Sequence, residues 1–151
     1  MTTTTDQKAR WRERLWWVGL WLMGLAFATA GVLHFTNPAP FVAIIPPWLP
    51  SPLTLVYLSG VAEIGLGLGV LVPKTRRLAA WGLVALLIAV FPANIYHAVA
   101  DVPMGGSTMP LAYHIVRLPM QLVLIAWAWL YTRPFPNHRA APPGSTPRAL
   151  T

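Results

Sequence analysis

The sequence predicts an all-α integral membrane protein: a four-helix bundle with up-down topology and both termini in the cytoplasm. Three observations lead to this fold class. The chain is unusually apolar, its apolar residues fall into four long runs, and its basic residues occupy alternate connections between those runs. Of its 151 residues, 56% are hydrophobic, only 10% are charged and eight are tryptophans, a composition that matches membrane proteins rather than soluble domains.

Each apolar run is long enough to cross a bilayer, because a helix of about 20 residues rises roughly 30 Å, the thickness of the hydrocarbon core. The first and third runs contain no formal charge, the second contains only Glu63, and the fourth contains only Arg117. Pro119 also lies inside the fourth run. The predicted spans, in order, cover about residues 15–35, 53–72, 78–100 and 111–131.

These spans make one transmembrane domain of residues 15–131. A basic N-terminal tail, residues 1–14, precedes it, and a Pro-rich C-terminal tail, residues 132–151, follows it. Both tails are expected in the cytoplasm. Their end segments, "MTTTTDQ" and "FPNHRAAPPGSTPRALT", are expected to be disordered because their composition cannot bury an apolar core.

The basic residues predict the orientation of the bundle. Apart from Arg117, every lysine and arginine lies in residues 8–14, 74–77 or 133–148, whereas the connections 36–52 and 101–110 contain none. Basic flanks face the cytoplasm, so we expect a multi-pass protein of a prokaryotic cytoplasmic membrane. This placement, with attraction to anionic lipid, accounts for the net charge of +7. The lipid bilayer is therefore an expected partner and nucleic acid is not.

Polar residues collect in the outer halves of the predicted spans. Glu63 and Arg117 are the only formal charges inside the spans, and an unpaired charge at that depth is costly. We therefore expect Glu63 and Arg117 to pair and Asn94 and Gln121 to extend the network. The candidate polar site consists of Glu63, Arg117, Asn94, Gln121, His34 and His114, with His97 and Asp101 at its rim.

The third span carries a polar face at its outer end. Asn94, His97 and Asp101 follow one another at spacings of three and four residues, which places them on one side of a helix. Pro92 cannot donate a backbone hydrogen bond to the carbonyl of Ile88, so it predicts a kink just below this face. A kink there would make room for a cavity.

The 36–52 connection, "TNPAPFVAIIPPWLPSP", contains six prolines and no charge. Its prolines argue against a spanning helix, and its aromatic and branched residues argue against a solvated loop. We expect an interfacial segment over the outer mouth of the bundle. It is either a lid or lateral entrance for a lipid-like ligand, or a simple membrane anchor.

Small residues at four-residue spacing are expected to let helices approach closely. These residues are Gly65 and Gly69 in the second span and Ala85, Ala89 and Ala93 in the third.

Four segments resemble the DoxX-like family of small prokaryotic membrane proteins: "AGVLHFTNPAPFVAIIPPWLP", "VYLSGVAEIGLGLGVLVPKTRRLAAWGL", "VFPANIYHA" and "RLPMQLVLIAW". The resemblance covers about residues 15–130 and implies a four-helix membrane bundle. Some members of that family are associated with membrane redox assemblies, such as thiosulfate to quinone electron transfer, and most have no assigned reaction. In similar sequences the position of His97 is often apolar. The matching positions whose side chains could bind a ligand or take part in a reaction are His34, Glu63, Asn94, Arg117 and Gln121.

Three functional interpretations remain open, and the sequence does not decide whether the protein is an enzyme. The first is a non-enzymatic subunit or partner of a membrane assembly, including a homo-oligomer. The second is a quinone-linked redox subunit, in which Arg117, Gln121 or His114 binds the quinone carbonyls and Glu63 handles a proton. A protein partner or cofactor would have to supply the electrons, because the chain contains no cysteine.

The third interpretation is a metal or haem site built from His34, His97 and His114. Imidazole is a common metal ligand. However, no two of these histidines stand one helical turn apart on a single span, so the sequence itself does not assign a metal site.

Overall fold

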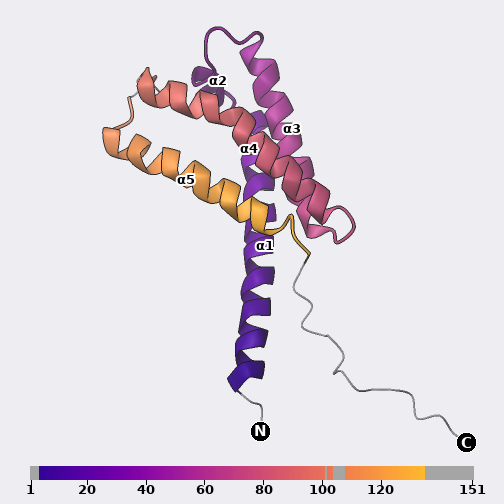
Figure 1. The fold of residues 1–151 in the computed structure, drawn as a ribbon. Helices are drawn as coiled ribbons and strands as arrows, with labels where there is room; N and C mark the ends of the chain where they lie inside the picture. Colours follow the sequence, from indigo (N-terminus) through magenta and orange to yellow (C-terminus); the bar gives the residue numbers. More distant parts are fainter. Residues whose placement is uncertain (1–3, 101, 104–107, 135–151) are drawn as a thin grey trace, which may run out of the picture.

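A computed structural model describes residues 4–100, 102–103 and 108–134 (Figure 1). Within these residues the chain is all-helical, with no strand. The helices are α1 (Thr4–Thr36), α2 (Ala39–Ala43), α3 (Pro52–Leu71), α4 (Arg76–Val99) and α5 (Leu111–Leu130). All except α2 are long and apolar enough to cross a membrane. The predicted all-α class with four spanning helices is therefore confirmed as the architecture of a multi-pass membrane protein.

The helix α1 is longer than the first predicted span. It begins at Thr4 and has 33 residues, so residues 4–14, which we predicted as a separate tail, are helical. Alanine, arginine, glutamate and lysine in this stretch all favour helix. In Figure 1 the N-terminal turns of α1 extend beyond the other helices, and Leu15 is 66% exposed.

The helices α1 and α3 pack closely in antiparallel directions. A Cβ added to Gly24 would lie 2.7 Å from the carbonyl oxygen of Gly67, and one added to Gly31 would lie 2.6 Å from that of Gly60. The contacts are reciprocal, because a Cβ on Gly67 would lie 2.7 Å from the carbonyl oxygen of Gly24. Four glycines, two on each helix and seven residues apart, therefore bring the two backbones together. We call this contact the glycine seam.

The small residues that we predicted for packing are only partly the right ones. A Cβ on Gly65 would meet nothing within 4 Å, and Ala85 and Ala89 are exposed. Gly69 does lie close to a neighbour, since its added Cβ would be 3.0 Å from the Cβ of Ala79. The sequence shows that a helix has small residues, but it does not show which side faces a partner.

Apolar packing concentrates at one end of the helical domain, which we call the core end. Here α1, α3, α4 and α5 contribute Leu20, Met23, Phe27, Val70, Ala79, Ala80, Leu83, Val84, Leu87, Ala128 and Tyr131 to one buried cluster. Two long-range hydrogen bonds close this end. Tyr131 Oη donates to the carbonyl oxygen of Trp16 at 3.1 Å, and Arg77 Nε donates to that of Thr132 at 3.0 Å.

The opposite end, which we call the histidine end, buries polar side chains. It is formed by the last turns of α1 and α4 and the first turns of α3 and α5, together with α2. Its buried polar residues are His34, Asn94, His97, His114 and Gln121.

The Pro-rich connection is a packed part of the histidine end. The ring of Phe41, in α2, stacks on His34 of α1 with centroids 3.9 Å apart. The ring of Trp48 meets Tyr96 of α4 edge-on at 5.5 Å. Pro46 is also almost completely buried. The connection therefore joins α1 to α4 across this end of the domain.

Both prolines inside spans are accommodated within continuous helices. The helix α4 continues through Pro92 and α5 continues through Pro119. The fourth span is thus helical over the predicted residues, and the kink at Pro92 stays a prediction. Large hydrophobic side chains are exposed along all four long helices, as contact with a lipid bilayer requires.

Candidate functional site

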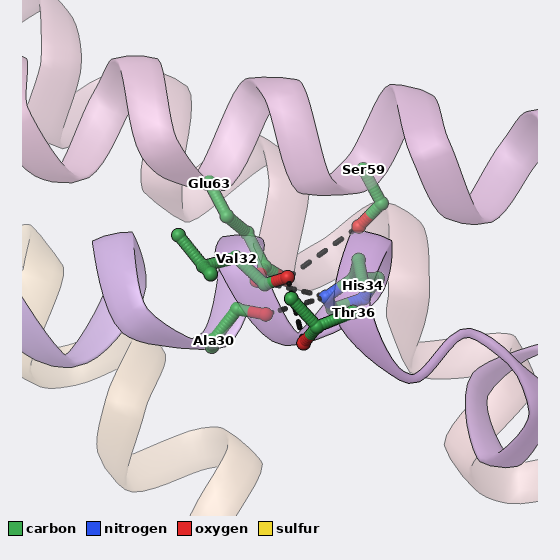
Figure 2. Close-up of polar contacts among 6 residues, drawn as sticks. All are labelled: Ala30, Val32, His34, Thr36, Ser59 and Glu63. Carbon is green, nitrogen blue, oxygen red and sulfur yellow. Dashed lines mark hydrogen bonds and ion pairs between the residues drawn. The ribbon is translucent and has the colours of Figure 1, made fainter.

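The polar side chains of the histidine end form two clusters rather than one. The first lies between α1 and α3 (Figure 2), where the imidazole of His34 and the carboxylate of Glu63 point toward each other. His34 Nδ1 lies 3.5 Å from Glu63 Oε2. Ser59 Oγ donates to Glu63 Oε1 at 3.5 Å from one helical turn earlier on α3. The cluster therefore brings together an acid, an imidazole and a hydroxyl.

The backbone of α1 determines the tautomer of His34. Its Nδ1 lies 2.8 Å from the carbonyl oxygen of Ala30, and because a carbonyl only accepts, Nδ1 must carry the proton. The same N–H faces Glu63. The side chains of His34 and Glu63 are only 9% and 12% exposed, so an ion pair between them forms in a poorly solvated place whenever His34 is protonated.

Two neighbours hold His34 in this position. An added Cβ on Gly60 would lie 2.8 Å from the Cβ of His34, so the glycine seam leaves the space that the imidazole needs. Phe41 of α2 covers the ring by stacking on it. The pair of His34 and Glu63 is thus enclosed by three helices.

The second cluster lies between α4 and α5 and is centred on Arg117. Its Nε and one terminal nitrogen donate to Asn94 Oδ1 at 3.2 and 2.7 Å, and the other terminal nitrogen donates to Tyr113 Oη at 2.6 Å. Asn94 Nδ2 donates to Gln121 Oε1 at 3.1 Å. Gln121 Nε2 then donates to the carbonyl oxygen of Leu87 at 2.8 Å. We call this chain of hydrogen bonds the arginine network.

The predicted pair of Glu63 and Arg117 is wrong. In the described part of the chain, the carboxylate of Glu63 lies beside the imidazole of His34, and Arg117 donates to Asn94 on the neighbouring helix. Asn94 and Gln121 do join Arg117, as expected. The sequence does not show toward which helix each side chain turns.

His97 of α4 and His114 of α5 form a ring contact beside the arginine network. Their ring centroids are 4.8 Å apart and their planes are nearly perpendicular, at 85°. The ring of Tyr113 borders both histidines, with centroids 5.9 and 5.4 Å away. Asp101, which we predicted at the rim, lies outside the described residues.

The three histidines of the predicted metal site do not lie together. His34 belongs to the cluster with Glu63, whereas His97 and His114 contact each other. Among the described residues, no group of three histidine, cysteine, aspartate or glutamate side chains is arranged to hold a metal ion.

Sequence reasoning missed several partners in these clusters. Ser59 precedes Glu63 by four residues, and Tyr113 precedes Arg117 by four, so the ordinary one-turn spacing on a helix could have identified both. The stacking of Phe41 on His34 and the use of the Leu87 carbonyl had no comparable signal, because each depends on tertiary packing.

Two surface hollows lie at the other end of α1. They are lined by Gln7, Arg10, Trp11 and Arg14 and their neighbours on the same helix. His34 follows Arg14 by twenty residues along the helix, or roughly 30 Å, so these hollows are separate from the polar clusters.

The family of the chain was established by comparison with known proteins. No curated protein and no solved structure was found to match it. Residues 23–132, which include all four spanning helices in whole or part and both polar clusters, match the family described as a domain of unknown function (DUF8561). The chain therefore belongs to the DUF8561 family.

Proposed function

We propose that this protein is a non-enzymatic subunit or partner of a membrane protein assembly, in which the polar residues of the spans fix the arrangement of the helices. The observation that carries the proposal is the closed arginine network. All three nitrogens of the Arg117 guanidinium donate to acceptors within α4 and α5, and the amides of Asn94 and Gln121 link those helices further.

A network of this kind serves packing better than ligand binding. Within a bilayer, interhelical hydrogen bonds stabilise helix pairs by roughly 1 kcal/mol each and select one register between them. A ligand that recruited Arg117 would first have to break its bonds to Asn94 and Tyr113. The guanidinium is therefore already used as a structural cross-link.

The orientation of the chain in the membrane is part of the proposal. The basic residues on both sides of the core end, in residues 8–14, 74–77 and 133, favour a cytoplasmic location for that end and for both termini. The histidine end then faces outward from a prokaryotic cytoplasmic membrane, in an up-down bundle. We also propose a relationship to DoxX-like proteins, on the segments quoted above.

A second function is favoured by the pair of His34 and Glu63. An imidazole and a carboxylate in contact, under the ring of Phe41, can accept and release a proton. This suits a quinone-linked redox subunit in which the pair binds a quinone carbonyl and exchanges its proton. Arg117 and Gln121 are already hydrogen-bonded within the arginine network, so the quinone-binding groups would be His34 and Glu63. A partner protein would supply the electrons.

Native mass spectrometry of the protein, purified from its own membranes in a mild detergent, tests both functions. The assembly function predicts a complex of defined stoichiometry without bound quinone, and Glu63→Gln should leave that complex intact. Exposed Glu13 provides the matched control, Glu13→Gln. A stoichiometric quinone that is lost only in Glu63→Gln would instead establish the second function. A lone chain with neither partner nor copy would contradict the assembly function.

A further inference from the structure

The contact between His97 and His114 has no role in either function above. The two residues come from neighbouring helices, α4 and α5, and both are buried, at 0% and 6% exposure. We propose that they form a binding site for a divalent transition-metal ion, Cu²⁺ or Zn²⁺, to which each histidine contributes one ring nitrogen.

The relative position of the rings suits a shared ion. With a metal–nitrogen bond of about 2.0–2.1 Å, the centroid of an imidazole lies about 3.2 Å from the metal. Two such rings whose bonds meet at about 100° have centroids about 5 Å apart. The observed separation is 4.8 Å, with the planes at 85° rather than stacked. The pair thus suits adjacent positions of a tetrahedral or square-planar ion.

The hydrogen bonding of His114 points independently to a ligand. Neither of its ring nitrogens has a hydrogen-bond partner among the described residues. Buried polar atoms are nearly always satisfied, and an exception indicates a bound water, an ion or a functional group. The nearby amides of Asn94 and Gln121 are both engaged, which makes the unsatisfied imidazole stand out within the same end of the domain.

The surroundings define the kind of ion. Tyr113 borders both rings, but its hydroxyl accepts from Arg117 at 2.6 Å, so it acts as a support. Imidazole nitrogens are poor ligands for Ca²⁺ or Mg²⁺ and good ones for copper or zinc. The remaining coordination positions fall to water or to an anion, and the charge of Arg117 favours an anion. Copper binds most strongly of the divalent first-row metals, so Cu²⁺ is the sharpest probe.

Copper titration of the full chain tests the site directly. The protein is purified in detergent through a tag without histidines, stripped with a chelator and titrated with Cu²⁺. Elemental analysis counts the bound ions, and electron paramagnetic resonance counts the coordinating nitrogens. We expect one Cu²⁺ per chain with two imidazole nitrogens.

Histidine variants identify the ligands. His114→Phe is expected to abolish copper binding, whereas His34→Gln and His138→Gln, which alter the other two histidines of the chain, should retain it. Tryptophan fluorescence checks that each variant is folded. Unchanged binding in His114→Phe, or loss of binding in His138→Gln, overturns the proposal. If His114→Phe does not accumulate, the wild-type spectrum decides, because fewer than two imidazole nitrogens on the copper also overturns it.

Discussion

The two ends of the helical domain are held together by different forces. At the core end, apolar side chains from all four long helices pack into one cluster, and its cross-links run from side chains to backbone carbonyls. At the histidine end, polar side chains of neighbouring helices bond mainly to one another. Apolar packing tolerates exchange of similar side chains. A hydrogen-bonded network does not, because a lost partner leaves a buried polar group unsatisfied.

This difference predicts where substitutions have specific effects. At the core end, the effect of a substitution should follow the volume that it changes. At the histidine end, it should follow the hydrogen bond or ion pair that it removes. The glycine seam runs between the two ends and should be more sensitive than either, since it brings backbone against backbone.

The largest effect is expected for Gly67→Val. The new side chain would meet the carbonyl oxygen of Gly24 at 2.7 Å, so α1 and α3 would have to separate, at a cost of about 3 kcal/mol in the free energy of unfolding. Gly65→Val is the matched control, because its added Cβ meets nothing within 4 Å. Its effect should stay within about 0.5 kcal/mol. Unfolding in mixed detergent micelles, followed by tryptophan fluorescence, measures both. Equal effects of the two variants would show that the seam is not tight.

Next is Arg117→Met, which removes the centre of the arginine network. Asn94 Oδ1 would lose both its donors, and we expect the unfolding free energy to fall by about 2 kcal/mol. Adding Asn94→Leu should then cost less than the same change in the wild type, because its partner is already absent. Additive losses in this double-mutant cycle would refute the coupling between the two side chains.

Glu63→Gln should have a smaller effect. The amide keeps the shape of the side chain and can still accept from Ser59, but it removes the carboxylate that faces His34. We expect a loss of about 1 kcal/mol in the unfolding free energy. The same measurement on Glu13→Gln, an exposed site, should show no change. A loss larger than that of Arg117→Met would show that the pair of His34 and Glu63 contributes more to stability than the arginine network.

The smallest effect is expected at the core end, for Tyr131→Phe. The change removes one hydrogen bond, to the carbonyl oxygen of Trp16 at 3.1 Å, and leaves the ring packed against Trp16. The expected loss is roughly 0.6 kcal/mol. Tyr131→Ala, which also removes the ring from the apolar cluster, should cost several times more. If Tyr131→Phe were as damaging as Tyr131→Ala, the core end would depend on directional bonds after all.

The fold could be predicted from the sequence because the length of an apolar run directly limits what it can span. The four long helices lie where the runs lie. The first helix was predicted too short, since its charged turns were interpreted as a tail although lysine, arginine and glutamate favour helix.

The sequence predicted which residues belong to the candidate site better than it predicted which of them contact one another. Burial of His34, Asn94 and Gln121 follows from placing polar residues inside apolar spans. Which of them meet depends on how each helix is rotated about its axis, and small residues on several sides of α3 left that rotation open. The glycines at 60 and 67 turn α3 toward α1, and this rotation takes Glu63 to His34 instead of Arg117.

The glycine seam also has a mechanical consequence. Two helices that touch at a single point can pivot about it, but α1 and α3 touch backbone to backbone at two points separated by two helical turns. Those two contacts fix the crossing angle of α1 and α3. The two helices therefore form one rigid pair, which holds His34 and Glu63 in fixed register. The Pro-rich connection, which contacts His34 of α1 through Phe41 and Tyr96 of α4 through Trp48, links this rigid pair to α4.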